Sequence, residues 1–386
     1  DKLVDGYAGQ WSADPDKSRW ALQNVSKILH TAVVSRGSAP IVYLPRNDKN
    51  YLDNDFKDNH GKTLPLKQIL KAIKVDGFIA LKDGKILVEA YYNGYRSEKH
   101  HQMFSVTKSL IGALIGILVD EGKLDTSQLI PYYLPELIDS GWGDATLQQT
   151  LDQTTGIHWT TGPDEKSHFM MYSIASGFAG MQPNFPFKNG ISMLKTLVKE
   201  REHGLSCKYN SANSSVLGWL ITRISNQHWQ DLFSEKIWSK LGTEHDALIV
   251  VDSGGQGAGA VGFNTTLRDM ARFGVMMAQN GYYNGQQIVP RDWIDDIRYG
   301  NDDVRRAWKK GDRRELMEFG DSAFYHNQYR VLDSDKGIFI AQGAKGQMVY
   351  INVNENLVGV FQSSTEAPMD MKISRQQISI IEQISL

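Results

Sequence analysis

The chain has 386 residues, of which 41% are apolar and 22% charged, proportions typical of a soluble globular protein with ample core material. Its 42 basic and 44 acidic residues nearly cancel, which argues against a nucleic-acid partner, and the short basic run at residues 305–314 is interpreted as a solvated surface loop. The single cysteine, Cys207, excludes an internal disulfide and leaves the redox compartment open.

The sequence predicts no membrane span. The longest apolar run, Leu110 to Val119, is about half the length that crosses a bilayer and contains two glycines, so we expect a buried helix. Because the chain begins with Asp1, we expect a periplasmic or secreted protein if that start reflects signal-peptide removal, and a cytoplasmic protein otherwise. No pattern distinguishes a monomer from a homodimer.

The N-terminal part carries one strong local signal, a β-hairpin. Apart from a helical pattern over residues 20–30, the first part of the chain lacks sustained periodicity and is expected to wrap a surface. Residues 77–81 and 86–92 are β-rich and are joined by a segment containing Asp83-Gly84, a preferred hairpin turn. Two paired strands therefore precede a helix predicted to begin near Phe104.

The middle of the chain is predicted to be helical, and the end returns to strands. Helical patterns extend from about residue 125 to 241, a helix is expected over 267–280, and a loop region reaches about residue 321. The β-rich runs that follow are residues 325–332, 337–342, 347–353 and 357–362, before a last helix over 370–384. Strands at both ends with helices between them predict an α+β fold, with one antiparallel sheet built from both chain ends, flanked by helices, and an inserted all-helical lobe.

These elements divide the chain into two interleaved lobes. Residues 1–103 and 263–386 are assigned to the N-terminal and C-terminal parts of an α/β lobe, and residues 104–262 to the mainly helical lobe. We expect a ligand cleft between the lobes, where binding sites commonly form.

Ser105 and Lys108 form a Ser-x-x-Lys motif at the start of the apolar helix. Positions i and i+3 share a helix face, and burial lowers the pKa of a lysine so that its neutral amine can take the serine proton. The helix N-terminus favours negative charge that develops on a bound acyl group. A second match, Ser192 to Lys195, lies in a segment rich in lysine and is the weaker candidate. We therefore predict Ser105 as the nucleophile and Lys108 as its base.

Tyr209, in the segment Lys208-Tyr209-Asn210-Ser211, is the third candidate catalytic residue. A phenol desolvated between two lysines can be partly ionised and can shuttle a proton between Ser105 and the leaving group. The alternative is a half-buried structural tyrosine that packs against Trp219.

Taken together, these motifs resemble the class C β-lactamase superfamily, which includes penicillin-binding DD-peptidases, family VIII carboxylesterases and 6-aminohexanoate-dimer hydrolases. The resemblance extends from about residue 75 onward, and residues 151–157 are similar to a Thr-Ser-Gly-Leu segment common in that group. Residues 237–247 and 265–274 favour the dimer-hydrolase branch. The resemblance implies a β-lactamase/transpeptidase-like fold and acyl-enzyme chemistry.

One stretch departs from the β-lactamase pattern. Residues 343–347, Gly-Ala-Lys-Gly-Gln, stand where β-lactamases carry Lys-Thr-Gly, whose lysine helps to hold a substrate carboxylate. Ala344 falls at the lysine position, and Lys345, one step along a strand, would point to the opposite face. Ser211 stands where the class C enzymes place Asn. These departures argue against efficient penicillin hydrolysis.

The resemblance also implies oxyanion donors and substrate contacts. The backbone amides of Ser105 and Gln347 are expected to bind the oxyanion, since a main-chain donor does not depend on residue type. Tyr172 resembles a substrate-covering tyrosine of the dimer-hydrolase branch, with a core aromatic as the alternative, and Asn264 is expected to face the cleft or to cap a turn. The candidate substrate-binding residues are Ser211, Tyr172, Asn264, Lys345 and Gly346.

Several other chemistries lack their motifs. The chain has no Gly-x-Ser-x-Gly elbow and no zinc-binding spacing, and His100 and His101 are assigned to the surface. We therefore expect a serine hydrolase without metal or cofactor that cleaves small amides or esters, with linear 6-aminohexanoate-type amides or short-chain esters ahead of β-lactams. The alternatives are a β-lactamase or DD-peptidase, a penicillin-binding sensor that is acylated at Ser105 without turnover, and a pseudoenzyme.

Overall fold

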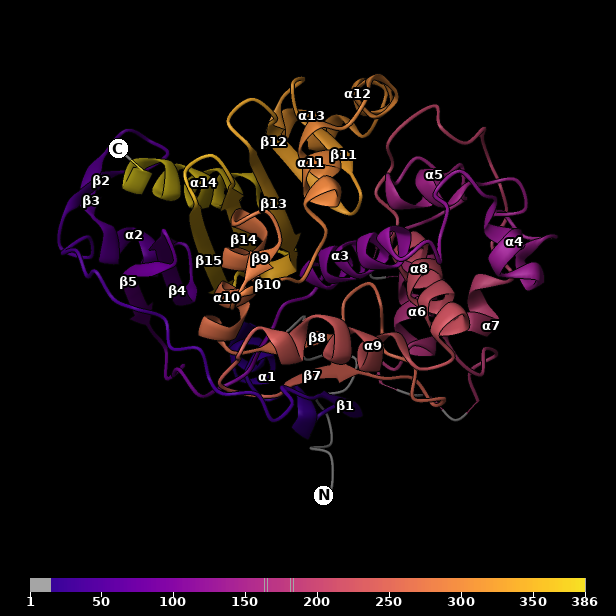
Figure 1. Cartoon of the computed structure of the whole chain (residues 1–386), viewed down its shortest axis with the longest axis horizontal. Coiled ribbons are helices and arrows are strands. Elements are labelled where there is room, and N and C mark those ends of the chain that lie inside the picture. The colour runs from indigo at the N-terminus through magenta and orange to yellow at the C-terminus, as the bar shows by residue number, and fades with distance from the viewer. Residues whose placement is uncertain (1–14, 163, 165, 181, 183, 386) are drawn as a thin grey trace.

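The computed structural model describes residues 15–385 except residues 163, 165, 181 and 183. Strands from both ends of the chain lie side by side in one sheet, and helices from the middle of the chain form a lobe beside it (Figure 1). The architecture is α+β, as the sequence predicted.

A seven-stranded antiparallel sheet combines the two chain ends. Its strands, in order across the sheet, are β11 (Phe324–His326), β12 (Tyr329–Asp333), β13 (Ile338–Gly343), β14 (Gln347–Asn352), β15 (Leu357–Ser363), β4 (Val75–Lys82) and β5 (Lys85–Tyr91). The C-terminal strand β15 pairs antiparallel with β4, from Leu357 opposite Lys82 to Ser363 opposite Val75. This pairing joins the two chain ends in one sheet, as expected from strands at both termini.

Two tight turns of left-handed backbone set the register at the edges of this sheet. Asp83 and Gly84 connect β4 to β5 with φ values of 51° and 71°, the geometry that an Asp-Gly hairpin favours. The run 325–332, predicted as one strand, is instead a second hairpin, because Asn327 and Gln328 have φ values of 46° and 71°. The turn contains no glycine, so its signal in the sequence is weak.

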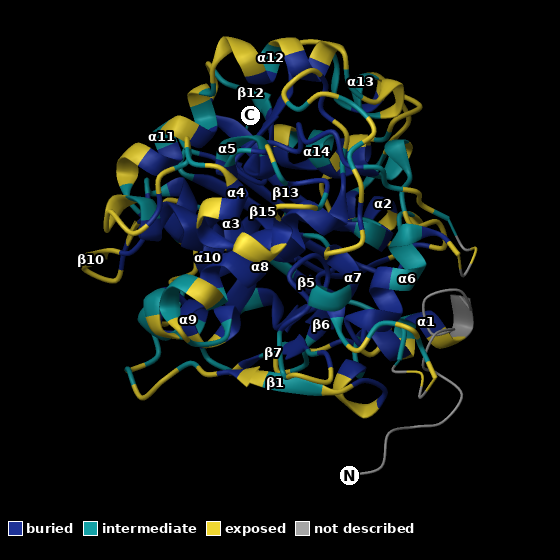
Figure 2. Cartoon of the chain, turned by 90° about the vertical axis from the view of Figure 1, so that its right-hand side faces the viewer, coloured by how far each residue is buried: buried dark blue, intermediate teal, exposed yellow. Residues whose placement is uncertain are grey.

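Apolar side chains on the two faces of the sheet belong to two separate core clusters. Along β4, Ile79 and Leu81 join the cluster that includes α10 (Leu267–Ala278) and α3 (Val106–Asp120). Phe78 and Ala80 join the other cluster, beneath α2 (Leu66–Ala72) and α14 (Met371–Ser385). Helices therefore cover both faces, and the strands and α3 carry the buried colour in Figure 2.

A four-stranded sheet lies next to the start of α3. Its order is β1 (Thr31–Val34), β7 (Ala247–Val250), β8 (Phe263–Thr265) and β6 (His101–Gln102). Gln102 pairs with Asn264 across β6 and β8, just before the chain enters α3. The remaining short N-terminal and connecting elements are α1 (Pro15–Leu22), η1 (Val25–Lys27), β2 (Asp55–Lys57), β3 (Thr63–Pro65), β9 (Tyr282–Tyr283) and β10 (Gln286–Gln287).

Helix α3 is the central element, and every residue from Val106 to Leu118 is buried. Its glycines permit close approach of neighbours: a Cβ on residue 112 would lie 2.4 Å from the Asn327 carbonyl oxygen, and one on residue 116 would lie 2.3 Å from the Trp293 ring. Among the helices of the described residues, none has the length and apolarity needed to span a bilayer.

The helical lobe connects α3 to β7. Its elements are α4 (Ile130–Tyr133), η2 (Pro135–Leu137), α5 (Leu147–Leu151), α6 (His168–Ala175), α7 (Gly190–Leu194), α8 (Ser211–Ser225), α9 (Trp229–Lys236) and η3 (Trp238–Lys240). Helices α5, α7 and α9 pack against α8, and α8 packs against α3, so the lobe is built around these two long helices.

The prediction of a loop up to about residue 321 was wrong. That region contains α11 (Arg291–Tyr299), α12 (Asp302–Lys309) and α13 (Arg313–Phe319), and the basic run lies partly in α12. The buried face of α12 comprises only three residues, Val304, Ala307 and Trp308, too few to produce a sustained apolar period. Side chains of Asn301 and Asp312 cap α12 and α13.

Candidate active site

Ser105 and Lys108 meet at the N-terminus of α3. Ser105 is the N-cap residue, and the Lys108 Nζ lies 3.0 Å from its Oγ and 2.7 Å from the Ala260 carbonyl oxygen. Lys108 is only 1% exposed. Burial, and then the positive charge of Arg330, hold the pKa of its amine well below the usual range. A neutral amine at this distance can accept the Ser105 proton.

A sharp turn presents Ser105 to the site. Phe104, immediately before it, has a left-handed backbone with φ of 47°, which is uncommon for a large side chain. Thr107, inside the motif, donates its hydroxyl to the Phe104 carbonyl at 2.6 Å and accepts from the Phe263 amide at 3.0 Å. These two bonds join the first turn of α3 to β8 and hold the strained turn in place.

Tyr209 reaches the same site from the segment before α8. Its ring centroid lies 4.9 Å from the Lys108 Nζ and 4.7 Å from the Arg330 Cζ, and its ring packs edge-on against Tyr325 at 6.0 Å. Burial raises the pKa of the phenol, while the Arg330 charge and a hydrogen bond with Ser105 oppose that rise. The raised pKa corrects the expectation of partial ionisation, because it favours a protonated phenol that can act as a proton donor.

Tyr209 does not lie between two lysines, contrary to the prediction from the sequence. The cations at its ring are Lys108 and Arg330, whereas Lys208 is exposed and lies 3.8 Å from Glu200. The alternative packing partner, Trp219, has the Lys195 Nζ over its ring at 5.7 Å. The sequence motif alone did not identify Arg330; its only signal was a charged residue inside a predicted strand.

Gln153 holds the main chain on both sides of Tyr209. Its backbone carbonyl accepts from the Lys208 amide at 2.9 Å, and its side-chain Oε1 accepts from the Asn210 amide at 2.9 Å. The same Oε1 accepts from the Asn213 side chain at 2.9 Å. Gln153 itself has a left-handed φ of 57°. Residues 151–157, noted for their resemblance to a family segment, therefore position Tyr209.

The hairpin between β13 and β14 lies directly against Ser105. A Cβ on residue 343 would be 2.2 Å from the Met103 carbonyl oxygen and 3.2 Å from the Ser105 nitrogen, so only glycine fits there. Gly343 pairs with Gln347 across the hairpin. The Gln347 amide as the second oxyanion donor remains a prediction.

The expected strand position of Lys345 was wrong. Ala344–Gly346 form a 3-10 turn, and Lys345 has a left-handed φ of 59°, so alternation along a strand does not apply. The Lys345 Nζ donates to the carbonyl oxygens of Thr365 and Glu366 at 3.1 and 3.2 Å. The Gly346 carbonyl accepts from the Gln377 side chain. Substrate contacts of Lys345 and Gly346 remain predictions.

Tyr172 and Ser211 are buried and lie close to each other through Ser215. Burial raises the pKa of Tyr172 to about 12, and hydrogen bonds with Ser215 and Ser176 oppose that rise. Ser215 donates its hydroxyl to the Ser211 carbonyl at 3.1 Å. Their substrate-binding roles remain predictions.

Asn264 lies on strand β8 and is buried. Its Nδ2 donates to the Gly262 carbonyl at 2.8 Å, while its Oδ1 has no hydrogen-bond partner among the described residues. A buried acceptor without a partner is costly, so this oxygen is suited to a ligand donor or a bound water. Contact with substrate remains a prediction for Asn264.

The second Ser-x-x-Lys match forms a helix cap. Ser192 donates its Oγ to the Asn189 carbonyl at 2.7 Å and accepts from the Asn189 amide at 3.1 Å, in a capping box at the start of α7. The Lys195 Nζ lies over Trp219 rather than at Ser192. Only the first match therefore has the serine–lysine contact.

Known proteins of related sequence and structure define the family. The family model described as Beta-lactamase matches residues 67–382. The chain belongs to the beta-lactamase family. A 6-aminohexanoate-dimer hydrolase of Paenarthrobacter ureafaciens is 29% identical over 364 residues, which cover 93% of this chain and 88% of that protein.

Solved structures agree with this assignment. A Bacillus anthracis protein, named provisionally as a 6-aminohexanoate-dimer hydrolase, superposes with a TM-score of 0.89 at 27% identity and covers 100% of this chain and 98% of its own. A family VIII carboxylesterase has a TM-score of 0.58 at 15% identity, over 83% of this chain and 95% of its own, and shows the shared fold alone. The resemblance predicted from the sequence is confirmed, and the protein is a beta-lactamase-family serine hydrolase.

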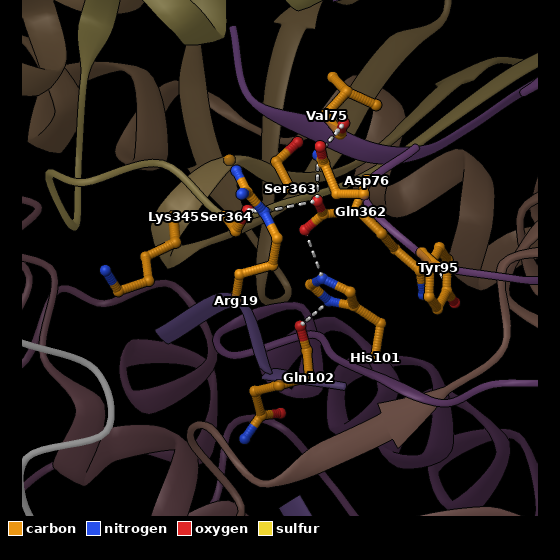
Figure 3. A network of polar contacts seen from close by, with 12 residues as sticks. Arg19, Val75, Asp76, Tyr95, His101, Gln102, Lys345, Gln362, Ser363 and Ser364 are labelled. Carbon is orange, nitrogen blue, oxygen red and sulfur yellow. Dashed lines mark hydrogen bonds and ion pairs between the residues drawn. The ribbon is translucent and has the colours of Figure 1, made fainter. Parts of the chain in front are cut away.

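In this beta-lactamase-family chain, the surface assignment of His101 was wrong. His101 lies on β6 and is fully buried, with its Nε2 3.3 Å from Asp76 and its Nδ1 3.0 Å from the Gln102 carbonyl. Figure 3 shows it between these two residues, with Arg19 reaching Asp76 from the other side. Pairing of β6 with the distant strand β8 buries His101, whereas His100 contacts the Asp246 carbonyl.

Proposed function

We propose that this protein hydrolyses small linear amides or short-chain esters through an acyl-enzyme on Ser105. The observation that carries the proposal is the 3.0 Å contact between the Ser105 Oγ and the buried Lys108 Nζ, beside the ring of Tyr209. The relative named as a 6-aminohexanoate-dimer hydrolase supports a linear amide, and the carboxylesterase fold is compatible with an ester.

The acylation step moves one proton around three side chains. Neutral Lys108 takes the Ser105 proton as the Oγ attacks the substrate carbonyl carbon, and the carbonyl oxygen becomes an oxyanion held by the amides of Ser105 and Gln347. Tyr209 donates its phenolic proton to the leaving amine or alkoxide as the carbon–heteroatom bond breaks, and the Lys108 ammonium returns a proton to Tyr209. This sequence leaves an ester on Ser105 and a neutral Lys108.

Deacylation uses the same groups in reverse. Water gives a proton to the Lys108–Tyr209 pair as its oxygen attacks the acyl carbon. The proton then passes to the departing Ser105 oxygen. The products are a carboxylic acid and the free serine, so no external reactant besides water is consumed.

The hairpin at residues 343–347 supports linear amides or esters over β-lactams. The Lys345 amine is bound by the carbonyls of Thr365 and Glu366, and Ala344 offers no charge. A substrate whose carboxylate must be bound by a lysine of this hairpin therefore gains little binding energy from it.

The experiment that tests the proposal combines labelling with turnover. A fluorophosphonate should label Ser105, as mapped by peptide mass spectrometry, in wild type and in S192A but not in S105A. Turnover should be faster for a p-nitrophenyl ester or the linear 6-aminohexanoate dimer than for a chromogenic cephalosporin. Labelling at Ser192 would overturn the mechanism, and a single cephalosporin burst without turnover would indicate a penicillin-binding sensor.

A further inference from the structure

A second buried cation lies at the catalytic tyrosine. Arg330, on β12, is only 4% exposed. Its Cζ lies 4.7 Å from the ring centroid of Tyr209, 5.5 Å from that of Tyr325 and 5.7 Å from that of Phe319. Three aromatic rings from separate parts of the chain therefore surround one guanidinium, an arrangement that holds a cation away from water.

Glu315 fixes the guanidinium in this position. The Arg330 Nε and Nη2 donate to the two carboxylate oxygens of Glu315 at 2.8 and 2.5 Å. Such a paired geometry sets the plane of the guanidinium as well as its distance. Because Glu315 belongs to α13, a separate element orients Arg330 toward Tyr209.

Two basic side chains thus share the Tyr209 ring, since the Lys108 Nζ lies 4.9 Å from the same centroid. Two positive charges at one buried ring disfavour each other, which favours loss of a proton from one of the two groups. A guanidinium does not lose its proton in a protein, so the amine of Lys108 is the neutral member. This arrangement, together with the high intrinsic pKa of a guanidinium, favours Lys108 as the base.

We propose that Arg330, anchored by Glu315, is a positioning residue that keeps Lys108 neutral and favours proton release from Tyr209. This inference rests on the proposed function, in which Lys108 and Tyr209 transfer the proton. The fixed positive charge at Tyr209 therefore comes from β12. The amine of Lys345, in the 343–347 hairpin, is bound instead by the carbonyls of Thr365 and Glu366.

Burial favours the neutral forms of two further titratable groups at this cluster. Burial raises the pKa of Tyr325, on β11, well above its usual range. Burial likewise raises the pKa of the Cys207 thiol, which faces Glu315 and Arg330 from the segment before Tyr209. The charges that act on Tyr209 are those of Arg330 and, with opposite sign, Glu315, and the charge of Arg330 also acts on Lys108. Burial and then the positive charge of Arg330 lower the pKa of Lys108, in agreement with this arrangement.

The test is the pH profile of kcat/KM, whose acid limb reports deprotonation of the base and whose alkaline limb reports the acid. In R330Q both limbs should move to higher pH, by about one unit, so that the rate below the acid limb falls about tenfold while the plateau persists. R330K should restore much of the wild-type profile. E315Q keeps a hydrogen-bond acceptor but removes the opposing charge, so both limbs should move to lower pH.

A matched control and a distinguishing outcome complete the design. Arg268 also forms a paired contact with a glutamate, Glu89, at 2.6 and 3.0 Å, and R268Q should leave the profile unchanged.

An equal loss of rate at every pH in R330Q, or shifts of the same sign in R330Q and E315Q, would overturn the inference. If R330Q does not fold, R330K and E315Q decide. Wild-type labelling and turnover with unshifted variant profiles would reject the role of Arg330 alone, whereas no labelling and no turnover in wild type would reject the proposed function as well.

Discussion

The imidazole Nδ1 of His326 lies 2.8 Å from the Asp152 carboxylate, so the last residue of β11 is paired with the C-cap residue of α5. Its Nε2 lies 3.2 Å from Asp296 of α11. Burial disfavours the charged imidazole, but the charges of Asp152 and Asp296 outweigh burial and raise the pKa of His326 to about 10. A charged histidine thus links the helical lobe to the sheet.

The free energy of unfolding should therefore fall as the pH rises from the ordinary histidine pKa of about 6.5 to the folded value of about 10. Both the folded and the unfolded states bind the proton below the ordinary histidine pKa of about 6.5, so the contribution is complete there. It declines between pH 6.5 and the folded value of about 10, where the unfolded state has already lost its proton. Urea unfolding of wild type and H326Q should show a difference of a few kcal/mol at pH 6 that shrinks toward pH 10. A pH-independent difference would contradict this account, and H60Q, at an exposed histidine, should behave like wild type.

Replacing the buried base should separate activity from stability. K108M keeps a similar volume but removes the amine that lies at the Ser105 Oγ, so kcat/KM for an ester should fall at least about a thousandfold. The melting temperature should stay the same or rise, because burial of an amine costs free energy that a thioether does not incur. Circular dichroism and a thermal melt, beside the esterase assay, test both parts. A variant that retains substantial activity would exclude Lys108 as the base.

Much of the fold and the contact between Ser105 and Lys108 followed from local sequence. The β4–β5 hairpin follows from Asp83-Gly84, because that dipeptide favours the left-handed turn found there. Ser105 and Lys108 share one helical turn, so their proximity depends on little beyond the formation of α3.

The rest of the site depends on tertiary packing that no local pattern encodes. Arg330 and Glu315 come from β12 and α13, more than a hundred residues after Tyr209 in the chain. The turn at Lys345 requires a left-handed lysine, which sequence propensity disfavours. The pairing of β6 with β8, far along the chain, covers His101, and no local pattern around His100 and His101 indicates that pairing.

Loss of the Gln153 side chain should impair the chemical step more than substrate binding. Q153A removes the acceptor of the Asn210 amide and the Asn213 side chain, leaving two buried donors without that partner, at a cost of about 1–3 kcal/mol each. Because these bonds hold the main chain next to Tyr209, kcat should fall while KM changes little. Steady-state kinetics with one ester, together with Y209F as the reference for loss of the phenol, would check this. An unchanged kcat, or an increase confined to KM, would show that Gln153 does not position Tyr209.

The hairpin glycine beside Ser105 gives the last test. In G343A the new methyl group would meet the Met103 carbonyl oxygen at 2.2 Å and the Ser105 nitrogen at 3.2 Å, so the hairpin or the turn before α3 must move. Overpacking of this kind costs about 1–3 kcal/mol, and displacement of the Ser105 amide should lower kcat by a hundredfold or more, roughly the effect of removing one oxyanion donor. Fluorophosphonate labelling rates should fall in parallel, because the phosphonyl oxygen uses the same donors. G254A is the control, since its nearest atom is a side-chain oxygen of Asp252 at 3.3 Å. Normal labelling and turnover in G343A would mean that the hairpin does not form part of the oxyanion site.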